Sequence, residues 1–261
     1  MIKLLFTGLV ILFVRHRFFW KARHRDFCPN FMAHRGIKIH SPENTISSYQ
    51  EALQNGFKGI ELDVISLKDD TLVCSHNYDL ERETDGFGWF YKKDKTELDR
   101  VCAGIRTHPQ NTQPVPQLEE ALSNIPKNIF LNLEIKVRSL FDLSTATTIR
   151  RMIQDQKIAH PFMISSFSPL VVAYFRLFCQ NATIGYLVKT PKWIWPINWI
   201  HPDYLHPRAD IVNDEVFKMS KNHRLPLNLW TVNNIPAIEW CRKNNVNSVI
   251  TDNPACPLQT T

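Results

Sequence analysis

The sequence predicts an α/β fold, namely a TIM-type (β/α)8 barrel that carries a small insertion and an apolar N-terminal segment. Short β-rich runs alternate with helical patterns along the chain, which is typical of repeated β-α units. The 261 residues suit one barrel of this type, which needs about 250. Apolar residues make up 44% of the chain, enough for one large core. We therefore expect a barrel domain over residues 28–261 and a separate segment over residues 1–27.

The expected elements can be placed from these patterns. Strands are expected at Phe31–His34, Gly59–Ile65, Leu72–His76, Ile129–Lys136, Phe162–Phe167, Ala182–Val188, Leu227–Val232 and Val246–Thr251, with a further one near Ala209–Val212. Helices are expected at Thr45–Asn55, Leu118–Asn124, Leu143–Gln156, Pro169–Cys179, Asp214–Asn222 and Ile235–Asn244. Ser41-Pro42 has the residue types that open a helix, and Gly56 has the type that ends one. Residues 77–117 are polar and irregular, which indicates an insertion over one end of the barrel.

The N-terminal segment is apolar over its first fourteen residues, apart from Lys3, Thr7 and Gly8, and then becomes basic and aromatic from Arg15 to Lys21. A secretory signal ends in small residues, which are missing here. A transmembrane helix needs about 20 apolar residues, more than this run provides. The pattern favours association with a membrane, either across it or as an anchor on its surface, with the basic side and the barrel domain in the cytoplasm. A secreted or periplasmic protein, and a plain helix packed on the barrel, remain alternatives.

Charge and cysteine content limit the partners. The net charge of +6 favours anionic partners such as phosphate esters or acidic lipid, and no nucleic-acid-binding module is recognisable. Six scattered cysteines form no Cys-x-x-Cys pair, which favours free thiols in a reducing compartment. We therefore expect an anionic partner such as a phosphate ester, a possible membrane surface as partner, and no nucleic acid.

Two pairs of polar residues interrupt apolar strands. Glu61 and Asp63, like Glu134 and Lys136, are two residues apart and so share one face of a strand. Charges on the inner face of a barrel strand are costly unless they are paired or bind a metal, and barrel enzymes place their sites at the carboxyl ends of strands. Oxygen ligands without cysteine suit Ca²⁺ or Mg²⁺, so Glu61, Asp63 and Glu134 are candidate metal ligands. A structural salt bridge is the alternative.

Two histidines also end predicted strands, His34 and His76. A pair of imidazoles can serve as general acid and general base at a phosphate ester. Arg35, next to His34, has the fork of donors that clamps a phosphate, and Gly36 permits a close backbone approach. A lone histidine at a strand end is more often structural, so the interpretation depends on the whole set. The other eight histidines are expected mostly at the surface.

The ordered motifs resemble the glycerophosphodiester phosphodiesterase family over roughly residues 31–255. The matching stretches are His34-Arg35-Gly36, Pro42-Glu43-Asn44-Thr45, Glu61-Leu62-Asp63-Val64, Leu72-Val73-Cys74-Ser75-His76, Pro116-Gln117-Leu118-Glu119-Glu120, Asn132-Leu133-Glu134-Ile135-Lys136, Ser165-Ser166-Phe167, Leu229-Trp230-Thr231-Val232-Asn233 and Ile250-Thr251-Asp252-Asn253-Pro254. The resemblance implies metal-dependent hydrolysis of glycerophosphodiesters to sn-glycerol 3-phosphate and an alcohol. It implies that a cation binds at the three carboxylates and that the two histidines form the acid–base pair.

The resemblance also implies roles for four further residues. Arg35 and Lys136 match phosphate-contacting positions, Trp230 matches a wall of the pocket, and Asn44 matches a residue that orients the site. The family usually has His-Asp where this chain has His76 followed by asparagine, which leaves the orientation of His76 open.

Several other functions remain open at this stage. The tryptophan-rich segment of residues 193–199, together with the N-terminal segment, favours lysophospholipid substrates cleaved at a membrane by a lysophospholipase D reaction. A phosphoinositide-cleaving phospholipase C shares the barrel and the histidines but fits the motifs less well. A non-catalytic lipid- or phosphate-binding relative is a third alternative.

Overall fold

The computed structural model describes residues 2–23 and 28–259, and its centre is a barrel of eight parallel strands. The barrel strands are β1 (Phe31–His34), β2 (Gly59–Ser66), β6 (Phe130–Ile135), β7 (Phe162–Ser166), β8 (Thr183–Val188), β9 (Tyr204–Pro207), β10 (Asn228–Leu229) and β11 (Ser248–Thr251). Their order is β10-β11-β1-β2-β6-β7-β8-β9, and parallel bridges between the β9 and β10 regions, from Leu205 to Leu227 and from Arg208 to Trp230, close the ring. This confirms the predicted TIM-type fold.

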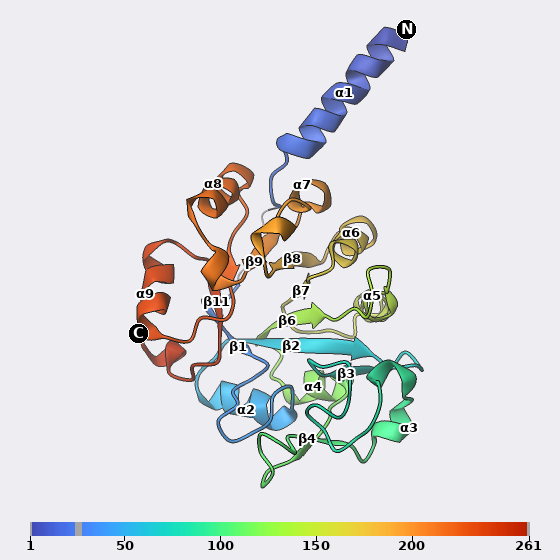
Figure 1. The fold of residues 1–261 in the computed structure, drawn as a ribbon, viewed down its shortest axis with the longest axis vertical. Coiled ribbons are helices and arrows are strands. Elements are labelled where there is room, and N and C mark those ends of the chain that lie inside the picture. The colour runs from blue at the N-terminus through green and yellow to red at the C-terminus, as the bar shows by residue number, and fades with distance from the viewer. Residues whose placement is uncertain (1, 24–27, 260–261) are drawn as a thin grey trace.

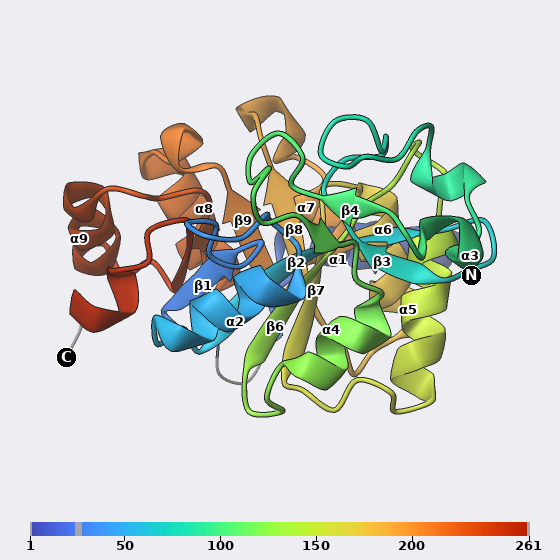
Figure 2. The same cartoon turned by 90° about the horizontal axis from the view of Figure 1, so that it is seen from below.

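Helices surround the barrel, as Figures 1 and 2 show. They are α2 (Ile46–Gln54), α4 (Leu118–Asn124), α5 (Ser144–Gln154), α6 (Pro169–Phe178), α7 (Ile197–Ile200), α8 (Asp214–His223) and α9 (Ile235–Lys243). Side chains that alternate along the strands pack outward against these helices, among them Leu62, Val64, Leu133 and Ile135. The opposite set points into the barrel, so Glu61, Asp63, Asn132 and Glu134 face its interior.

The predictions for three elements need correction, namely the strand near Ala209–Val212, the start of the helix that ends before Gly56, and the strand Leu72–His76. The expected strand near Ala209–Val212 is a 3₁₀ turn, and the strand lies earlier, at β9. Helix α2 begins at Ile46 with Thr45 as its cap, because the Thr45 hydroxyl accepts the backbone N–H of Ser48. Ser41-Pro42 therefore lies in the loop before this helix. Gly56 does follow the helix end, with a positive φ of 83°.

The stretch predicted as the strand Leu72–His76 differs in direction and length. It is β3 (Leu72–Cys74), which pairs antiparallel with the end of β2 instead of joining the barrel. The insertion that follows contains the short elements α3 (Lys95–Leu98), β4 (Cys102–Ala103) and β5 (Gln113–Pro114), and it has a small core of its own around Leu80 and Phe90. It lies beside β3 at one side of the barrel (Figure 1).

The N-terminal helix α1 (Ile2–Phe18) projects away from the barrel (Figure 1). Its apolar side chains are largely exposed, for example Phe6 (69%) and Leu12 (63%), and Phe13 near its end contacts Trp199 of α7. Among the described residues, no helix combines the length and hydrophobicity needed to span a membrane. The predicted boundary between residues 27 and 28 falls at the edge of residues 24–27, which lie outside the described residues.

The chain after α1 is attached firmly to the barrel. The Trp20 ring is stacked between His201 and His223, with ring centroids 4.7 and 4.3 Å away, and its Nε1 donates to Asn198. Arg23 forms an ion pair with the fully buried Asp203 at 2.7 Å. The base of α1 is therefore fixed to the body, even though most of the helix stands free.

Candidate active site

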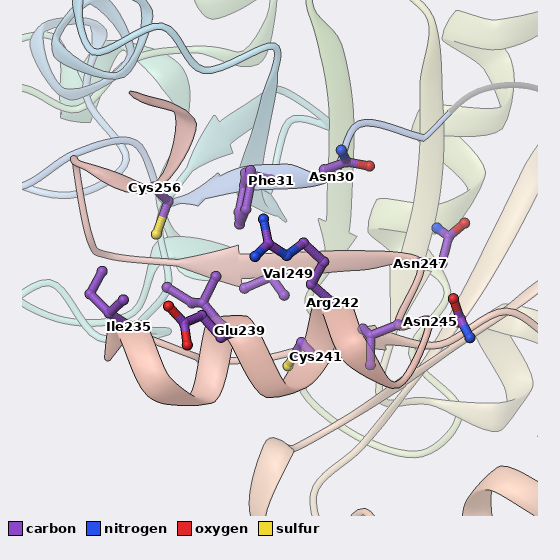
Figure 3. A pocket seen from close by; sticks show the side chains of 12 residues that line it. Asn30, Phe31, Ile235, Glu239, Cys241, Arg242, Asn245, Asn247, Val249 and Cys256 are labelled. Carbon is purple, nitrogen blue, oxygen red and sulfur yellow. The ribbon is translucent and has the colours of Figure 1, made fainter. Parts of the chain in front are cut away.

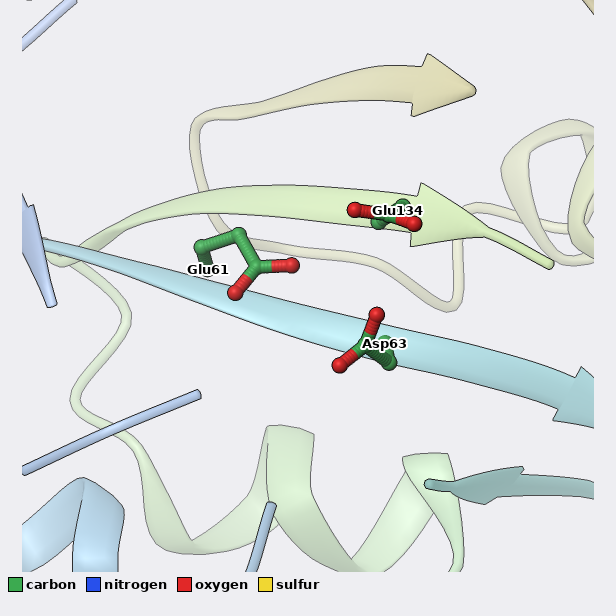
Figure 4. Close-up of side chains that lie close together, drawn as sticks. All are labelled: Glu61, Asp63 and Glu134. Atoms are coloured by element: carbon green, nitrogen blue, oxygen red, sulfur yellow. The ribbon is translucent and has the colours of Figure 1, made fainter. Parts of the chain in front are cut away.

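The three carboxylates proposed from sequence as metal ligands lie together. Glu61 and Asp63 point inward from β2, and Glu134 lies on β6 directly opposite Asp63 in the strand register. Figure 4 shows their carboxylates directed toward a common space. One oxygen from each residue lies within 4.8 Å of the others, and the three side chains are buried. This spacing suits ligands around a single cation.

The hydrogen bonding of the three carboxylates leaves room for such a cation. Glu61 Oε2 accepts the backbone N–H of Arg35 at 2.9 Å, but Glu61 Oε1 is buried without a hydrogen-bond partner among the residues described. A buried carboxylate oxygen without a partner is costly. The residues therefore fit a hard divalent cation, which would satisfy this oxygen.

The electrostatics of the cluster lead to the same conclusion. Burial, reinforced by the charges of Asp63 and Glu134, raises the pKa of Glu61 well above its usual range. Burial also raises the pKa of Glu134, although Lys136 opposes the effect. Burial acts in the same direction on Asp63, but Lys136 and Arg35 together outweigh it and lower the pKa of Asp63. A divalent cation would stabilise the ionised form of all three carboxylates.

Two cations border the carboxylate cluster. Arg35 Nε lies 3.2 Å from Asp63 Oδ2, and Arg35 Nη1 donates to Glu43 at 2.9 Å. Lys136 Nζ donates to Glu134 at 2.9 Å and lies 3.3 Å from Asp63 Oδ1. Burial by itself would lower the pKa of Arg35 and of Lys136. The neighbouring carboxylates outweigh this effect and raise both pKa values, so both side chains stay charged. They supply fixed positive charge where an anionic group would meet the cluster.

Both candidate histidines line one cavity of about 320 Å³ together with Glu61 and Glu134. His34 ends β1, and its Nδ1 contacts Asp252 Oδ1 at 2.8 Å. His76 lies two residues beyond β3, where the backbone N–H of Ser75 donates to the Asp63 carbonyl. Burial lowers the pKa of His76 to about 4, so this imidazole is neutral at neutral pH.

Asn44 and Trp230 have distinct surroundings. Asn44, with a positive φ of 56°, donates from Nδ2 to Asp63 Oδ2 at 2.8 Å and accepts the backbone N–H of Asp63 at 3.1 Å. It therefore fixes both the side chain and the backbone of Asp63. Trp230 lines the cavity, packs edge-on against Phe167 at 5.4 Å, and donates to the carbonyl of His206.

The structure adds residues to which the sequence assigned no role. Asp252 follows β11 and is held beside His34 by Lys38 Nζ at 2.7 Å and by Asn233 Nδ2 at 2.9 Å. Lys189 follows β8 and lines the cavity. Both positions come directly after a barrel strand, which is the signal that could have identified them.

A second hollow lies on the outer side of the barrel. It has a volume of about 350 Å³ and lies between α9 and the strands β1 and β11, with Phe31, Val249 and Arg242 in its lining (Figure 3). It contains one carboxylate, from Glu239, and no histidine among its lining residues. Of these two hollows, it is therefore the cavity at the strand ends that brings carboxylates and histidines together.

The fold and the site define a class, a parallel α/β barrel hydrolase with a buried acidic cluster beside a cavity that two histidines line. Residues 34–256 match the glycerophosphoryl diester phosphodiesterase family, which covers most of the chain. The chain therefore belongs to this family and is an enzyme that hydrolyses glycerophosphodiesters, as the motifs predicted.

Individual relatives agree with this family. A glycerophosphodiester phosphodiesterase of Caldanaerobacter subterraneus subsp. tengcongensis is 28% identical over 228 residues, which are 85% of this chain and 93% of the relative. The structure of an Oleispira antarctica phosphodiesterase in complex with the product sn-glycerol-3-phosphate has a TM-score of 0.80 and 25% identity, covering 88% of this chain and 96% of that one. A putative glycerophosphoryl diester phosphodiesterase from Silicibacter pomeroyi shares the fold, with a TM-score of 0.76, 19% identity, and coverage of 91% and 94%.

Proposed function

We propose that Glu61, Asp63 and Glu134 hold a divalent cation, Ca²⁺ or Mg²⁺, and that His34 and His76 transfer the protons of the hydrolysis. The observation that carries this proposal is a cluster of three buried carboxylates, of which Glu61 and Glu134 line one cavity together with both histidines. The products would be sn-glycerol 3-phosphate and an alcohol, in keeping with the product complex of the Oleispira antarctica relative. When bound, the cation would polarise a phosphate oxygen.

Arg35 and Lys136 would hold the phosphate. Their ion pairs with the carboxylates keep both side chains charged and in place before substrate arrives. Charge that develops on the phosphate oxygens is then stabilised without reorganisation of the protein. Trp230 would form the wall of the cavity against the substrate, and Asn44 would keep Asp63 in its ligand position.

The two histidines would have different roles. His34 Nδ1 contacts the Asp252 carboxylate, which would hold its ring in place, so we assign His34 as the acid that protonates the leaving alcohol. His76 would act as the base that removes a proton from the nucleophile. That nucleophile is either a water molecule or the glycerol 2-hydroxyl, and the second would give a cyclic phosphate that is hydrolysed afterwards.

A leaving-group experiment tests this assignment. With a glycerophosphodiester of p-nitrophenol, whose anion leaves without a proton, His34→Ala should retain most of its activity, whereas with glycerophosphocholine it should lose about 100-fold or more. His76→Ala is the matched control and should lose activity equally on both substrates. An equal loss in His34→Ala on both substrates would reject the role of His34 as the acid.

Metal dependence is tested on the same substrates. Activity should disappear in EDTA and return on addition of Mg²⁺ or Ca²⁺, and the product should be glycerol 3-phosphate. Full activity in EDTA would contradict the cation site, and a product that remains a cyclic phosphate would contradict hydrolysis to glycerol 3-phosphate.

A second candidate is action on lysophospholipids at a membrane, with residues 1–27 as the membrane-binding segment and residues 28–261 as a catalytic domain on the cytoplasmic side. Its support is the free-standing apolar helix α1 beside a tryptophan-rich segment, in which Trp193, Trp195 and Trp199 are 46%, 58% and 44% exposed. Arg17 stacks over the Trp199 ring at 5.2 Å, which places a cation at the base of the helix. Exposed apolar surface next to aromatic and basic residues is typical of contact with acidic lipid.

Vesicle binding tests this candidate. The full chain should sediment with phosphatidylglycerol vesicles, and Leu9→Asp in α1 should abolish binding. Phe87→Asp is the matched control, because Phe87 is 79% exposed but lies in the insertion, at the end of the molecule opposite α1 in Figure 1. Lysophosphatidylcholine should be cleaved faster with vesicles present. The lipid proposal would be rejected if the full chain did not bind vesicles. It would also be rejected if lysophosphatidylcholine were cleaved no faster than glycerophosphocholine, which lacks the acyl chain.

A further inference from the structure

The cavity contains a lysine that has no part in the proposed mechanism. Lys189 follows β8 directly, is exposed, and lines the same cavity as His34 and Arg35. The other two cations of the site already form ion pairs, Arg35 with Glu43 and Lys136 with Glu134. Lys189, in contrast, makes no hydrogen bond or ion pair with any residue in the described part of the chain.

A count of charges shows that the positive charge of Lys189 is not needed to bind the glycerophosphate group, which all substrates share. One connected network contains five carboxylates and three cations, namely Glu43, Glu61, Asp63, Glu134 and Asp252 with Arg35, Lys38 and Lys136. A divalent cation at the carboxylate cluster would make this network neutral. The phosphodiester group would then be held by that cation together with Arg35 and Lys136. Lys189 is not needed for this contact.

The position of Lys189 indicates which part of the substrate it meets. In the ring of eight strands, β8 lies four strands from β1, on the opposite side of the barrel from His34 and Arg35. A substrate whose phosphate is held at β1, β2 and β6 reaches β8 only through the groups attached to the phosphate. Of these, the glycerol is uncharged and the alcohol varies between substrates, so a cation there discriminates between alcohols.

We propose that Lys189 is a specificity-determining residue that binds a negatively charged group on the alcohol, such as a carboxylate or a second phosphate. Anionic glycerophosphodiesters are then preferred to zwitterionic ones, because a quaternary ammonium next to Lys189 is repelled. This inference rests on the proposed function, since it assumes that the phosphate is held at the carboxylate cluster. A charge-assisted hydrogen bond of this kind corresponds to about a tenfold effect or more on binding.

The test uses two substrates that differ only in one carboxylate, glycerophosphoserine and glycerophosphoethanolamine. The wild-type enzyme should have a kcat/KM about tenfold higher for the serine compound, mainly through KM. Lys189→Met should remove this preference and leave the ethanolamine compound within about twofold, and Lys189→Glu should reverse it. Lys192→Met is the matched control, because Lys192 is exposed on the same loop but does not line the cavity, and it should keep the wild-type preference.

Two outcomes would overturn the proposal. An equal loss on both substrates in Lys189→Met would mean that Lys189 acts on the phosphate, and no change on either would mean that it does not contact the substrate. Dissociation constants measured by calorimetry with the His34→Ala protein, with and without Lys189→Met, give a readout that does not depend on turnover. If the wild-type enzyme hydrolyses neither compound, the proposed function fails, while the binding measurement still decides the role of Lys189.

Discussion

His206 is buried in the barrel in a way that makes the stability of the fold depend on pH. It lies on β9 with no exposed surface, and its Nε2 lies 3.1 Å from Asn228 Nδ2. The orientation of Asn228 is fixed, because its Oδ1 accepts from Asn247 Nδ2 at 2.8 Å. His206 Nε2 must therefore accept the hydrogen bond from Asn228. A proton on Nε2 would point at another donor.

Burial lowers the pKa of His206 from its ordinary value of 6.5 to about 3. The unfolded chain takes up a proton as the pH falls below about 6.5, whereas the folded chain stays unprotonated until about pH 3. The stability that depends on the neutral imidazole is therefore complete above pH 6.5 and is lost as the pH falls through this window. Between about pH 7 and pH 5 the loss in free energy of unfolding is about 2 kcal/mol.

Urea-induced unfolding, followed by circular dichroism at both pH values, measures this loss. His206→Gln keeps an acceptor for Asn228 but cannot titrate, so its free energy of unfolding should fall by about 2 kcal/mol less than that of the wild type between the two pH values. His76 and His201, whose pKa values burial also lowers to about 4, are present in both proteins and cancel in the difference. An equal loss in both proteins would refute the reasoning.

Three further predictions concern the active site. Asn44→Ala leaves the buried backbone N–H of Asp63 without its acceptor, so urea unfolding should show a loss of about 1–3 kcal/mol, and wild-type stability would contradict this role. Asp252→Asn should lower kcat by about 10- to 100-fold with little change in KM, because His34 loses the carboxylate that contacts its Nδ1 and holds its ring; an unchanged kcat would show that Asp252 is dispensable. In thermal unfolding, Mg²⁺ or Ca²⁺ at a hundredfold excess over its Kd should stabilise the wild type by about 2.7 kcal/mol but not Glu61→Gln, and equal shifts in the two proteins would place the cation elsewhere.

The sequence alone determined the barrel and the metal candidates, because both depend on short-range periodicity. Alternation along a strand places residues two apart on one face, so Glu61 and Asp63 had to point the same way once β2 formed. Strand and helix patterns in alternation permit few folds besides a barrel. The order of motifs then predicted the family, which the comparison over residues 34–256 confirmed.

Only the tertiary structure decided which distant segments meet. The strand that carries His76 toward the site runs antiparallel to β2, so its strand pattern could not reveal where that histidine lies. Asp252 lies 218 positions from its partner His34, and the neighbours of Lys189 and His206 come from other strands. Local patterns specify the face and the end of an element, whereas the pairing of charges across a barrel depends on strand order and register, which are set when the ring closes.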